Sequence, residues 1–267
     1  MRRSPATGKL ATMKHLLLLP MLALLGAAPA PEAQWQRIFD GKTLAGWTPK
    51  ITGRAIGEDP RHMFVVQDGA IRVSHANYAK FEGEFGHLFW KTPLKAYRIR
   101  FDYRLFGDPL PGIKTWQTSN SGLMFHAQAP ATMRRDQDFP VSLEFQLLGI
   151  PRPTEEPSGN LCTPGTSVVI DGKRDPRHCI LSTSPLLPVG QWTQAGLEVL
   201  PDGQITHFIN GKPVLHYAAA QLDPEDKDAQ PLIAAAGGKL QLHGGYIALQ
   251  SEGHPIEFRN IELQRLD

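Results

Sequence analysis

The hydrophobic and polar positions from residue 34 onward alternate with a period of two along short runs. Near the end of the chain, Phe258 lies between the polar residues Glu257 and Arg259, and the alternation breaks at Asn260. A period of two is typical of β-strands with one buried face, and one extra residue in such a run indicates a bulge. The last part of the chain therefore predicts two strands joined by a polar turn, with a bulge at Asn260.

Similar runs recur along the chain, and almost no stretch shows sustained helical periodicity. Asp-Gly or Asn-Gly pairs at residues 67–69, 201–203 and 209–212 predict hairpins, because glycine accepts a positive φ. The predicted strands are residues 64–66, 70–74, 87–90, 97–105, 121–127, 142–148, 194–200, 204–209, 212–217, 246–250 and 257–264.

The number of strands indicates how they are layered. A single open sheet of about a dozen strands would expose its edges and an apolar face, whereas two facing sheets bury both. The sequence therefore predicts an all-β sandwich or jelly roll, forming a single domain over residues 34–267. Residues 151–188, rich in Pro, Gly, Ser and Thr, form the longest predicted irregular stretch.

The first thirty residues differ from the rest in composition. Four basic residues precede an apolar run at residues 16–25, and small residues then lead to Ala30. This order predicts a secretory signal over residues 1–30 with an uncertain cleavage site, although an uncleaved anchor or a start at Met13 would also fit. The apolar run is too short for a spanning helix, which needs about 20 residues. We expect export to the periplasm or the medium, without stable membrane insertion.

Removal of residues 1–30 takes away four basic residues and no acids, so the net charge changes from +2 to −2. A weakly acidic chain without basic blocks gives no support for nucleic-acid binding. No Gly-rich phosphate loop follows a predicted strand, and no Gly-x-Ser-x-Gly motif occurs. We therefore expect neither a nucleotide cofactor nor α/β-hydrolase chemistry.

Cys162 and Cys179 are the two cysteines of the chain. An even pair in an exported protein predicts a disulfide. A zinc site is the alternative, with His178 as the adjacent nitrogen ligand.

Two predicted strands carry the candidate chemistry. Residues 142–148 place Glu144 and Gln146 on one face, and residues 120–126 place Gly122 and His126 on one face of a neighbouring strand. We therefore expect His126 beside Glu144 on a concave surface. A mid-strand glycine indicates either close approach of a ligand or another backbone, or a bulge. An ordinary solvated face is the alternative interpretation of these polar positions.

Other polar residues extend this set. His178, His243, Glu252 and His254 add possible metal ligands, although no tight ligand motif such as His-Glu-x-x-His is present. Trp116 lies in a polar loop just before the strand that begins at Asn120, which makes it the tryptophan most suited to stacking on a sugar.

Several motifs in the same order resemble the 3-keto-disaccharide hydrolase family, which includes 3-keto-glucoside 1,2-lyases and 3-keto-2-hydroxy-glucal hydratases. The resemblance spans nearly the whole chain after the predicted signal. It is carried by residues 39–47, 120–126 (Asn-Ser-Gly-Leu-Met-Phe-His), 143–147 (Leu-Glu-Phe-Gln-Leu), 210–214, 247–250 and 258–261.

The resemblance implies a concanavalin A-like lectin/glucanase jelly roll acting on a 3-keto-sugar or 3-keto-glycoside, and a functional link to a sugar 3-oxidoreductase that oxidises C3. A ketone at C3 acidifies the C2 proton, so a base can form an enolate that expels the C1 substituent; water can then add to the unsaturated sugar. Such a site needs a base, an enolate stabiliser and a proton donor for the leaving oxygen.

We assign catalytic roles to Glu144, His126 and His178, and sugar binding to Gln146, Asn120, Trp116 and His243. A divalent metal ion at the ketone would stabilise the enolate. The candidate ligands of this metal ion are Glu144, His126 and His178. Two alternatives remain, namely a non-catalytic carbohydrate-binding module of the same fold and an ordinary glycoside hydrolase, which normally uses two carboxylates.

Overall fold

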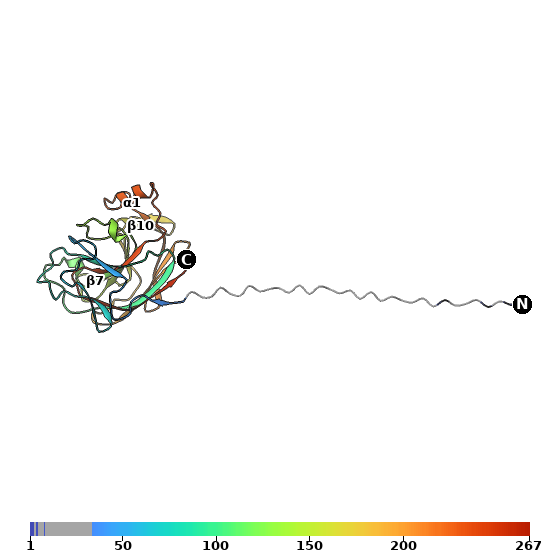
Figure 1. Cartoon of the computed structure of the whole chain (residues 1–267), viewed down its shortest axis with the longest axis horizontal. Helices are drawn as coiled ribbons and strands as arrows, with labels where there is room; N and C mark the ends of the chain where they lie inside the picture. Colours follow the sequence, from blue (N-terminus) through green and yellow to red (C-terminus); the bar gives the residue numbers. More distant parts are fainter. Residues whose placement is uncertain (3, 5–7, 9–33) are drawn as a thin grey trace. The chain divides into compact units, whose positions relative to one another are not determined.

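The computed structural model describes residues 1, 2, 4, 8 and 34–267. The predicted signal therefore lies largely outside the described residues. Residues 34–267 belong to one compact unit built from two antiparallel sheets (Figure 1).

The larger sheet has ten strands. In spatial order they are β11 (Lys173–Asp175), β10 (Thr166–Ile170), β15 (Lys212–Leu222), β14 (Gln204–Ile209), β13 (Thr193–Val199), β6 (Tyr97–Leu105), β17 (Ile256–Arg265), β4 (Ala70–Val73) and β3 (Phe64–Gln67), with β1 (Gln36–Arg37) also paired to β17.

The smaller sheet has seven strands. Their order is β12 (Cys179–Ile180), β9 (Asn160–Cys162), β8 (Leu143–Leu148), β7 (Asn120–Ala127), β16 (Tyr246–Ser251), β5 (Gly86–Trp90) and β2 (Trp47–Ile51). The helical elements are η1 (Thr115–Gln117), η2 (Pro130–Thr132) and α1 (Gln230–Ala235), and α1 lies at the periphery of the body (Figure 1).

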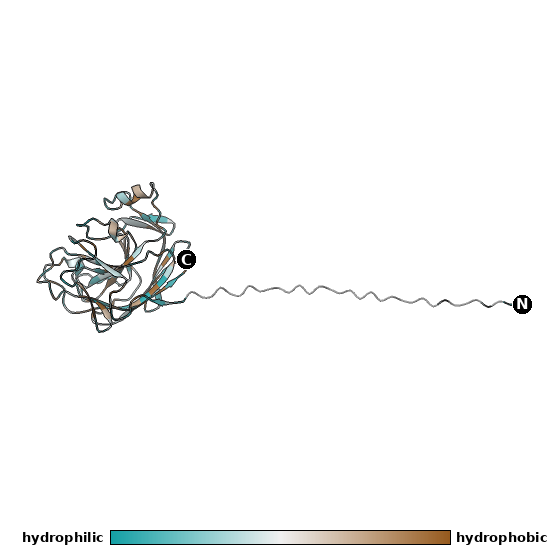
Figure 2. Ribbon diagram, viewed as in Figure 1, coloured by the Kyte–Doolittle hydropathy of each residue, from teal (hydrophilic) through white to brown (hydrophobic). Residues whose placement is uncertain are grey.

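The main core fills the space between the inner faces of the two sheets. Along β6, Ile99, Phe101 and Tyr103 are buried in this core, while Arg98 and Arg104 between them are partly exposed. Hydrophobic residues accordingly gather on strands inside the body, and much of the loop ribbon is hydrophilic (Figure 2). The predicted all-β jelly-roll sandwich is confirmed.

Local predictions also compare closely with the structure. The bulge expected at Asn260 is confirmed: this residue has a φ of 52°, and the pairing of β17 with β6 shifts between Arg259 and Glu262. The three predicted hairpins join β3 to β4, β13 to β14 and β14 to β15. The irregular stretch predicted over residues 151–188 is wrong in part, because it contains β9 to β12. Strands of two to five residues with several polar positions are too short to show a period.

The smaller sheet is covered on both faces. Every residue of β7 is buried, although a solvated outer face would leave alternate residues exposed. Part of the covering is a second apolar cluster, in which Met133 from the loop after β7 packs with Phe89, Met124 and Ala248 on the outer face. Beside this apolar cluster, on the same face of the sheet, lies a strip of polar residues. This strip forms the candidate site.

Candidate functional site on the outer face of the smaller sheet

Cross-strand pairing aligns a row of polar residues on the outer face. Lys50 on β2 pairs with His87 on β5, and His87 pairs with Gln250 on β16. On the next two strands, Gly122 pairs with Gln146 and Met124 pairs with Glu144. The inner face takes the alternate, apolar positions of these strands, so the polar positions face outward together.

Gly122 makes room for the carboxyl group of Glu144. A Cβ atom at this position would lie 2.7 Å from Glu144 Oε1 and 3.1 Å from Gln250 Oε1. The φ of Gly122 is not in the left-handed region, so the backbone conformation does not require a glycine here. A glycine is needed because a side chain at this position would collide with its neighbours. The groups that approach Gly122 closely are therefore side chains, whereas the sequence interpretation named a ligand or another backbone.

A cavity of about 460 Å³ opens beside this row. The sequence-predicted residues that line it are Trp116, Asn120, Glu144, Gln146 and His178, together with the disulfide between Cys162 and Cys179. Cys162 pairs across the strands with Glu144, so the disulfide ties the loop that carries His178 to the strand next to the carboxyl group.

The electrostatics of the cavity centre on two carboxyl groups. Glu144 and Glu252 are 6% and 2% exposed, and both line the cavity. Burial raises the pKa of Glu144 to about 8, with part of the effect offset by the neighbouring Gln250 amide. Burial, and then the charge of Glu144, raise the pKa of Glu252 well above its ordinary value. Each carboxyl group therefore holds a proton more tightly than a solvated one does.

Arg152 is a cation that lines the same cavity and interacts with Glu252. Its side chain is 3% exposed and its Nη2 lies 3.1 Å from Glu156. Its Nε and Nη1 make no hydrogen bond with any residue in the described part of the chain. Burial lowers the pKa of Arg152, whereas Glu156 and Glu252 oppose this change. Two guanidinium donors therefore remain available to a bound molecule.

Two amide side chains are held in defined orientations. Asn120 Nδ2 donates to the carbonyl of Trp116 at 3.1 Å, while its buried Oδ1 has no partner among the described residues. Gln146 Oε1 accepts a hydrogen bond from Asn160 Nδ2 at 3.1 Å, which leaves the Gln146 nitrogen as a donor. A hydroxyl-rich molecule could donate a hydrogen bond to Asn120 Oδ1 and accept one from the Gln146 nitrogen.

Trp116 supplies an aromatic wall. It is 42% exposed, lines the cavity and stacks on Phe85 with a ring separation of 6.2 Å and an angle of 6°. A fixed, exposed indole of this kind offers an apolar face to the ring of a sugar.

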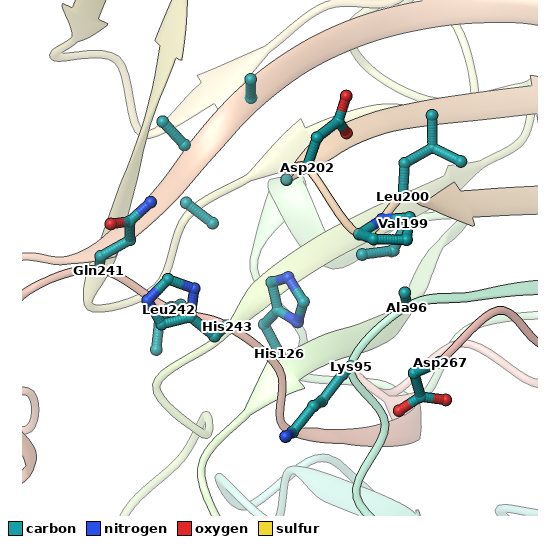
Figure 3. Close-up of a pocket in the computed structure, with 15 residues that line it drawn as sticks. Lys95, Ala96, His126, Val199, Leu200, Asp202, Gln241, Leu242, His243 and Asp267 are labelled. Carbon is teal, nitrogen blue, oxygen red and sulfur yellow. The ribbon is translucent and has the colours of Figure 1, made fainter.

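His126 and His243 lie elsewhere, so the expectation that His126 lies beside Glu144 is corrected. They line a second cavity of about 380 Å³, where Figure 3 shows their rings close together with Lys95 near the edge. His126 has a φ of 47°, and the pairing of β16 with β7 shifts between Tyr246 and Ala248. This bulge turns His126 away from the face of Glu144.

The metal hypothesis does not fit this arrangement. Of its three candidate ligands, Glu144 and His178 line the first cavity, whereas His126 lines the second. Among the residues that the structure describes, no group of three or more His, Cys, Asp or Glu side chains is placed to hold a metal ion. We therefore derive no step through a metal.

Sequence reasoning missed Arg152, Gln250 and His87 as site residues, and it treated Glu252 only as a possible metal ligand. Arg152 lies in the stretch that was expected to be irregular, so no strand face could be assigned to it. His87 and Gln250 are single polar residues within apolar runs, a signal that is compatible with an ordinary solvated face.

No helix of the described chain is long and apolar enough to cross a membrane.

The two-sheet sandwich is a jelly-roll fold, and solved structures share it. A structure from Parabacteroides distasonis, described as a candidate glycosyl hydrolase, has a TM-score of 0.52 at 15% identity, covering 87% of this chain and all of that chain. A protein of unknown function with a galectin-like fold from Bacillus subtilis has a TM-score of 0.50 at 12% identity, covering 83% and 90%. These likenesses show the fold alone.

Sequence comparison defines the family. The 3-keto-alpha-glucoside-1,2-lyase-like domain matches residues 34–264, and the chain therefore belongs to this family. A 3-keto-disaccharide hydrolase of Bacteroides thetaiotaomicron is 25% identical over 248 residues, which cover 86% of this chain and 78% of that relative.

Proposed function

We propose that this protein is a carbohydrate-active enzyme that cleaves the glycosidic bond of 3-keto-glycosides by β-elimination and then hydrates the unsaturated sugar. The observation that carries the proposal is Glu144, a buried carboxyl group with a raised pKa, at the wall of a cavity of about 460 Å³. The family and the name of the Bacteroides relative support a keto-sugar substrate.

Glu144 acts as the base in this proposal. A carboxylate whose proton affinity is raised by burial is a stronger base than a solvated carboxylate, which suits the removal of a proton from carbon next to a ketone. The ketone at C3 makes the C2 proton acidic, and the resulting enolate expels the oxygen at C1.

Arg152 supplies the charge that the enolate oxygen needs. Its two unpaired donors lie in a site largely closed to water, where electrostatic stabilisation is strongest. Asn120 and Gln146 bind sugar hydroxyls, and Trp116 stacks on the ring. His178, which lines two adjoining cavities, is the proposed donor to the leaving oxygen; burial lowers the pKa of its imidazole, so the ring donates through a neutral N–H.

The proposal has consequences outside the site. An oxidoreductase must first convert the C3 hydroxyl group of the sugar to a ketone, so a sugar 3-oxidoreductase is the expected functional partner. The signal predicted over residues 1–30 supports a reaction outside the cytoplasm as part of this proposal.

A second candidate function is ordinary glycoside hydrolysis, which Glu252 favours. It provides the second carboxyl group that the sequence alone did not pair with Glu144. A glycosidase needs one ionised and one protonated carboxyl group at the scissile bond. Burial here raises the pKa of both groups, which fits a pair of one ionised and one protonated carboxyl group less well.

The test is an assay with matched substrates. Purified protein is incubated with a 3-keto-glucoside and with its parent glucoside, each with and without a chelator, and aglycone release is followed. Release from the keto sugar alone is the expected result. Release from the parent would establish the glycosidase, while binding without release from either would identify a carbohydrate-binding module. Loss of activity with chelator would restore a role for a metal.

A further inference from the structure

Three neighbouring side chains on the outer face carry buried polar atoms without a protein partner. His87, Gln250 and Glu144 are 1%, 0% and 6% exposed. Both ring nitrogens of His87, both amide atoms of Gln250 and Oε1 of Glu144 have no described protein atom in full hydrogen-bond geometry, although the Gln250 amide lies near enough to the Glu144 carboxyl group to lower its pKa. Buried groups of this kind normally bind ordered water.

We call one place on the outer face the slot: it is where these three side chains and Gly122 meet. Gly122 contributes no side chain, and the polar atoms nearest to its missing Cβ are Glu144 Oε1 at 2.7 Å and Gln250 Oε1 at 3.1 Å. His87 is paired directly opposite Gln250 on the next strand. Phe139 packs against His87, with its ring edge-on at 5.8 Å between centroids, and also lines the cavity. The slot therefore carries polar atoms from three side chains and meets the cavity at Glu144 and Phe139.

We propose that the slot formed by Gly122, Glu144, Gln250 and His87 binds the water molecule that hydrates the unsaturated sugar. The inference rests on the proposed function and assigns its second half-reaction to defined residues. Burial, and then the charge of Lys50, lower the pKa of His87 to about 3, so its ring is neutral and has one donor and one acceptor nitrogen. The Gln250 amide likewise offers both, which suits a neutral water molecule.

Hydration adds water across the double bond that the elimination formed. Before this step Glu144 releases to solvent the proton that it took from C2, and His178 regains one from solvent. The Glu144 carboxylate takes a proton from the water, and the water oxygen forms a bond to C1. The C1–C2 double bond breaks, and its electron pair passes to the C3 oxygen as an enolate. Protonated Glu144 then returns the proton to C2, which gives the 3-keto sugar and restores the carboxylate. No oxidant or further reactant is required.

The test uses variants that remove the water ligands and leave the base in place. Gln250→Leu and His87→Phe are assayed with a 3-keto-glucoside, and NMR measures aglycone release and the ratio of hydrated to unsaturated sugar. We expect the ratio of hydrated to unsaturated sugar to fall about tenfold or more relative to wild type, the effect of losing one or two hydrogen bonds to the water.

His207→Phe is the matched control. His207 is also fully buried and has a lowered pKa, but its two ring nitrogens are paired with Gly159 O and Tyr217 Oη. This variant should keep the wild-type product ratio even if its stability falls. Gln250→Met is a second substitution at the same site in case Gln250→Leu does not fold.

A crystal structure gives a readout that is independent of activity. The wild-type protein should show a water within hydrogen-bond distance of both Glu144 and Gln250, and Gln250→Leu should lack it. An unchanged product ratio in folded Gln250 and His87 variants would overturn the inference, as would an equal change in His207→Phe. If wild type releases no aglycone from the keto sugar, the proposed function itself fails.

Discussion

The two faces of the seven-stranded sheet are equally buried but differ in chemistry. On the inner face, Leu123, Phe145 and Leu249 are fully buried in the main core. On the outer face, Gln250 and His87 are just as buried, yet none of their side-chain polar atoms has a partner in full hydrogen-bond geometry in the described part of the protein. Because an unpaired buried polar group is costly, the outer face is better explained by binding than by packing. Burial alone therefore does not separate core from site.

Two buried histidines sharpen this contrast. His207 donates and accepts through both nitrogens and stacks on Phe145 with a ring separation of 4.3 Å, as a structural residue does. His87 has the same burial and no partner among the residues described. Pairing of polar atoms thus distinguishes a residue that holds the fold from one that is available to a ligand.

The largest expected effect follows from replacing the proposed base. Glu144→Gln should lower kcat for aglycone release by about 10³-fold or more, as expected when a general base is lost. The melting temperature should change little, because the amide keeps the shape of the carboxyl group without the cost of burying a charge. Glu198→Gln, on the other sheet, is the control and should remain active. A fully active Glu144→Gln protein would remove this residue from the mechanism.

The second effect tests the slot in the sheet. Gly122→Ala would place a methyl group 2.7 Å from Glu144 Oε1 and displace the carboxyl group. We expect about a 10²-fold loss of kcat/KM from misplacement of the base, and a fall of about 1–3 kcal/mol in the free energy of unfolding.

Gly196→Ala is the matched control for this change. Gly196 is also a mid-strand glycine without a left-handed φ, but its nearest neighbour, Phe208 Cβ, is 3.4 Å away. Its activity should stay near that of wild type. Equal activity losses in both variants would indicate a general effect of filling strand glycines.

The pH dependence should show opposite trends for activity and stability. Since the pKa of Glu144 is raised from its ordinary 4.5 to about 8, kcat/KM should rise about tenfold per pH unit below pH 8 and then level off. Between these two pKa values the folded protein holds a proton that the unfolded chain has lost, so the free energy of unfolding should decrease as pH rises from about 4.5 to 8.

Rate profiles and chemical denaturation across this pH range check both trends. In Glu144→Gln the decrease in stability with pH should be smaller, because Glu252 alone then contributes to it. An activity that is flat between pH 6 and 8 would show that the base has an ordinary pKa.

The smallest expected effect concerns the stability of the two histidine sites. His207→Phe should lower the free energy of unfolding by about 1–3 kcal/mol, because Tyr217 and Gly159 lose their partner. His87→Phe should change it by less than about 1 kcal/mol, since this ring makes no hydrogen bond to the described protein. Urea denaturation of both variants measures the difference, and an equal loss would contradict the contrast drawn between the two residues.

Much of the fold could be predicted from the sequence, because alternation and turn chemistry are local. The period of two defined the long strands and placed Glu144 and Gln146 on the same face, where the structure also has them. The Asn260 bulge was visible because it breaks a strong pattern. Strands such as β11 and β12 have two or three residues and show no pattern to detect.

The remainder of the site depends on information that no local pattern contains. The bulge at His126 slips one strand against its neighbour and moves this residue to another cavity, although its own sequence alternates normally. Arg152 reaches the cavity from a stretch without a regular period. Whether Gln250 and His87 have partners depends on every element that packs against them.

The most direct test of the central claim follows the hydrogen at C2. Wild-type protein and Glu144→Gln are each incubated with a 3-keto-glucoside in D₂O, and the sugar product is examined by NMR. The account predicts deuterium at C2 of the hydrated product formed by wild type, with neither release nor exchange in Glu144→Gln. Rapid aglycone release with the original hydrogen kept at C2 would contradict proton abstraction and establish direct hydrolysis.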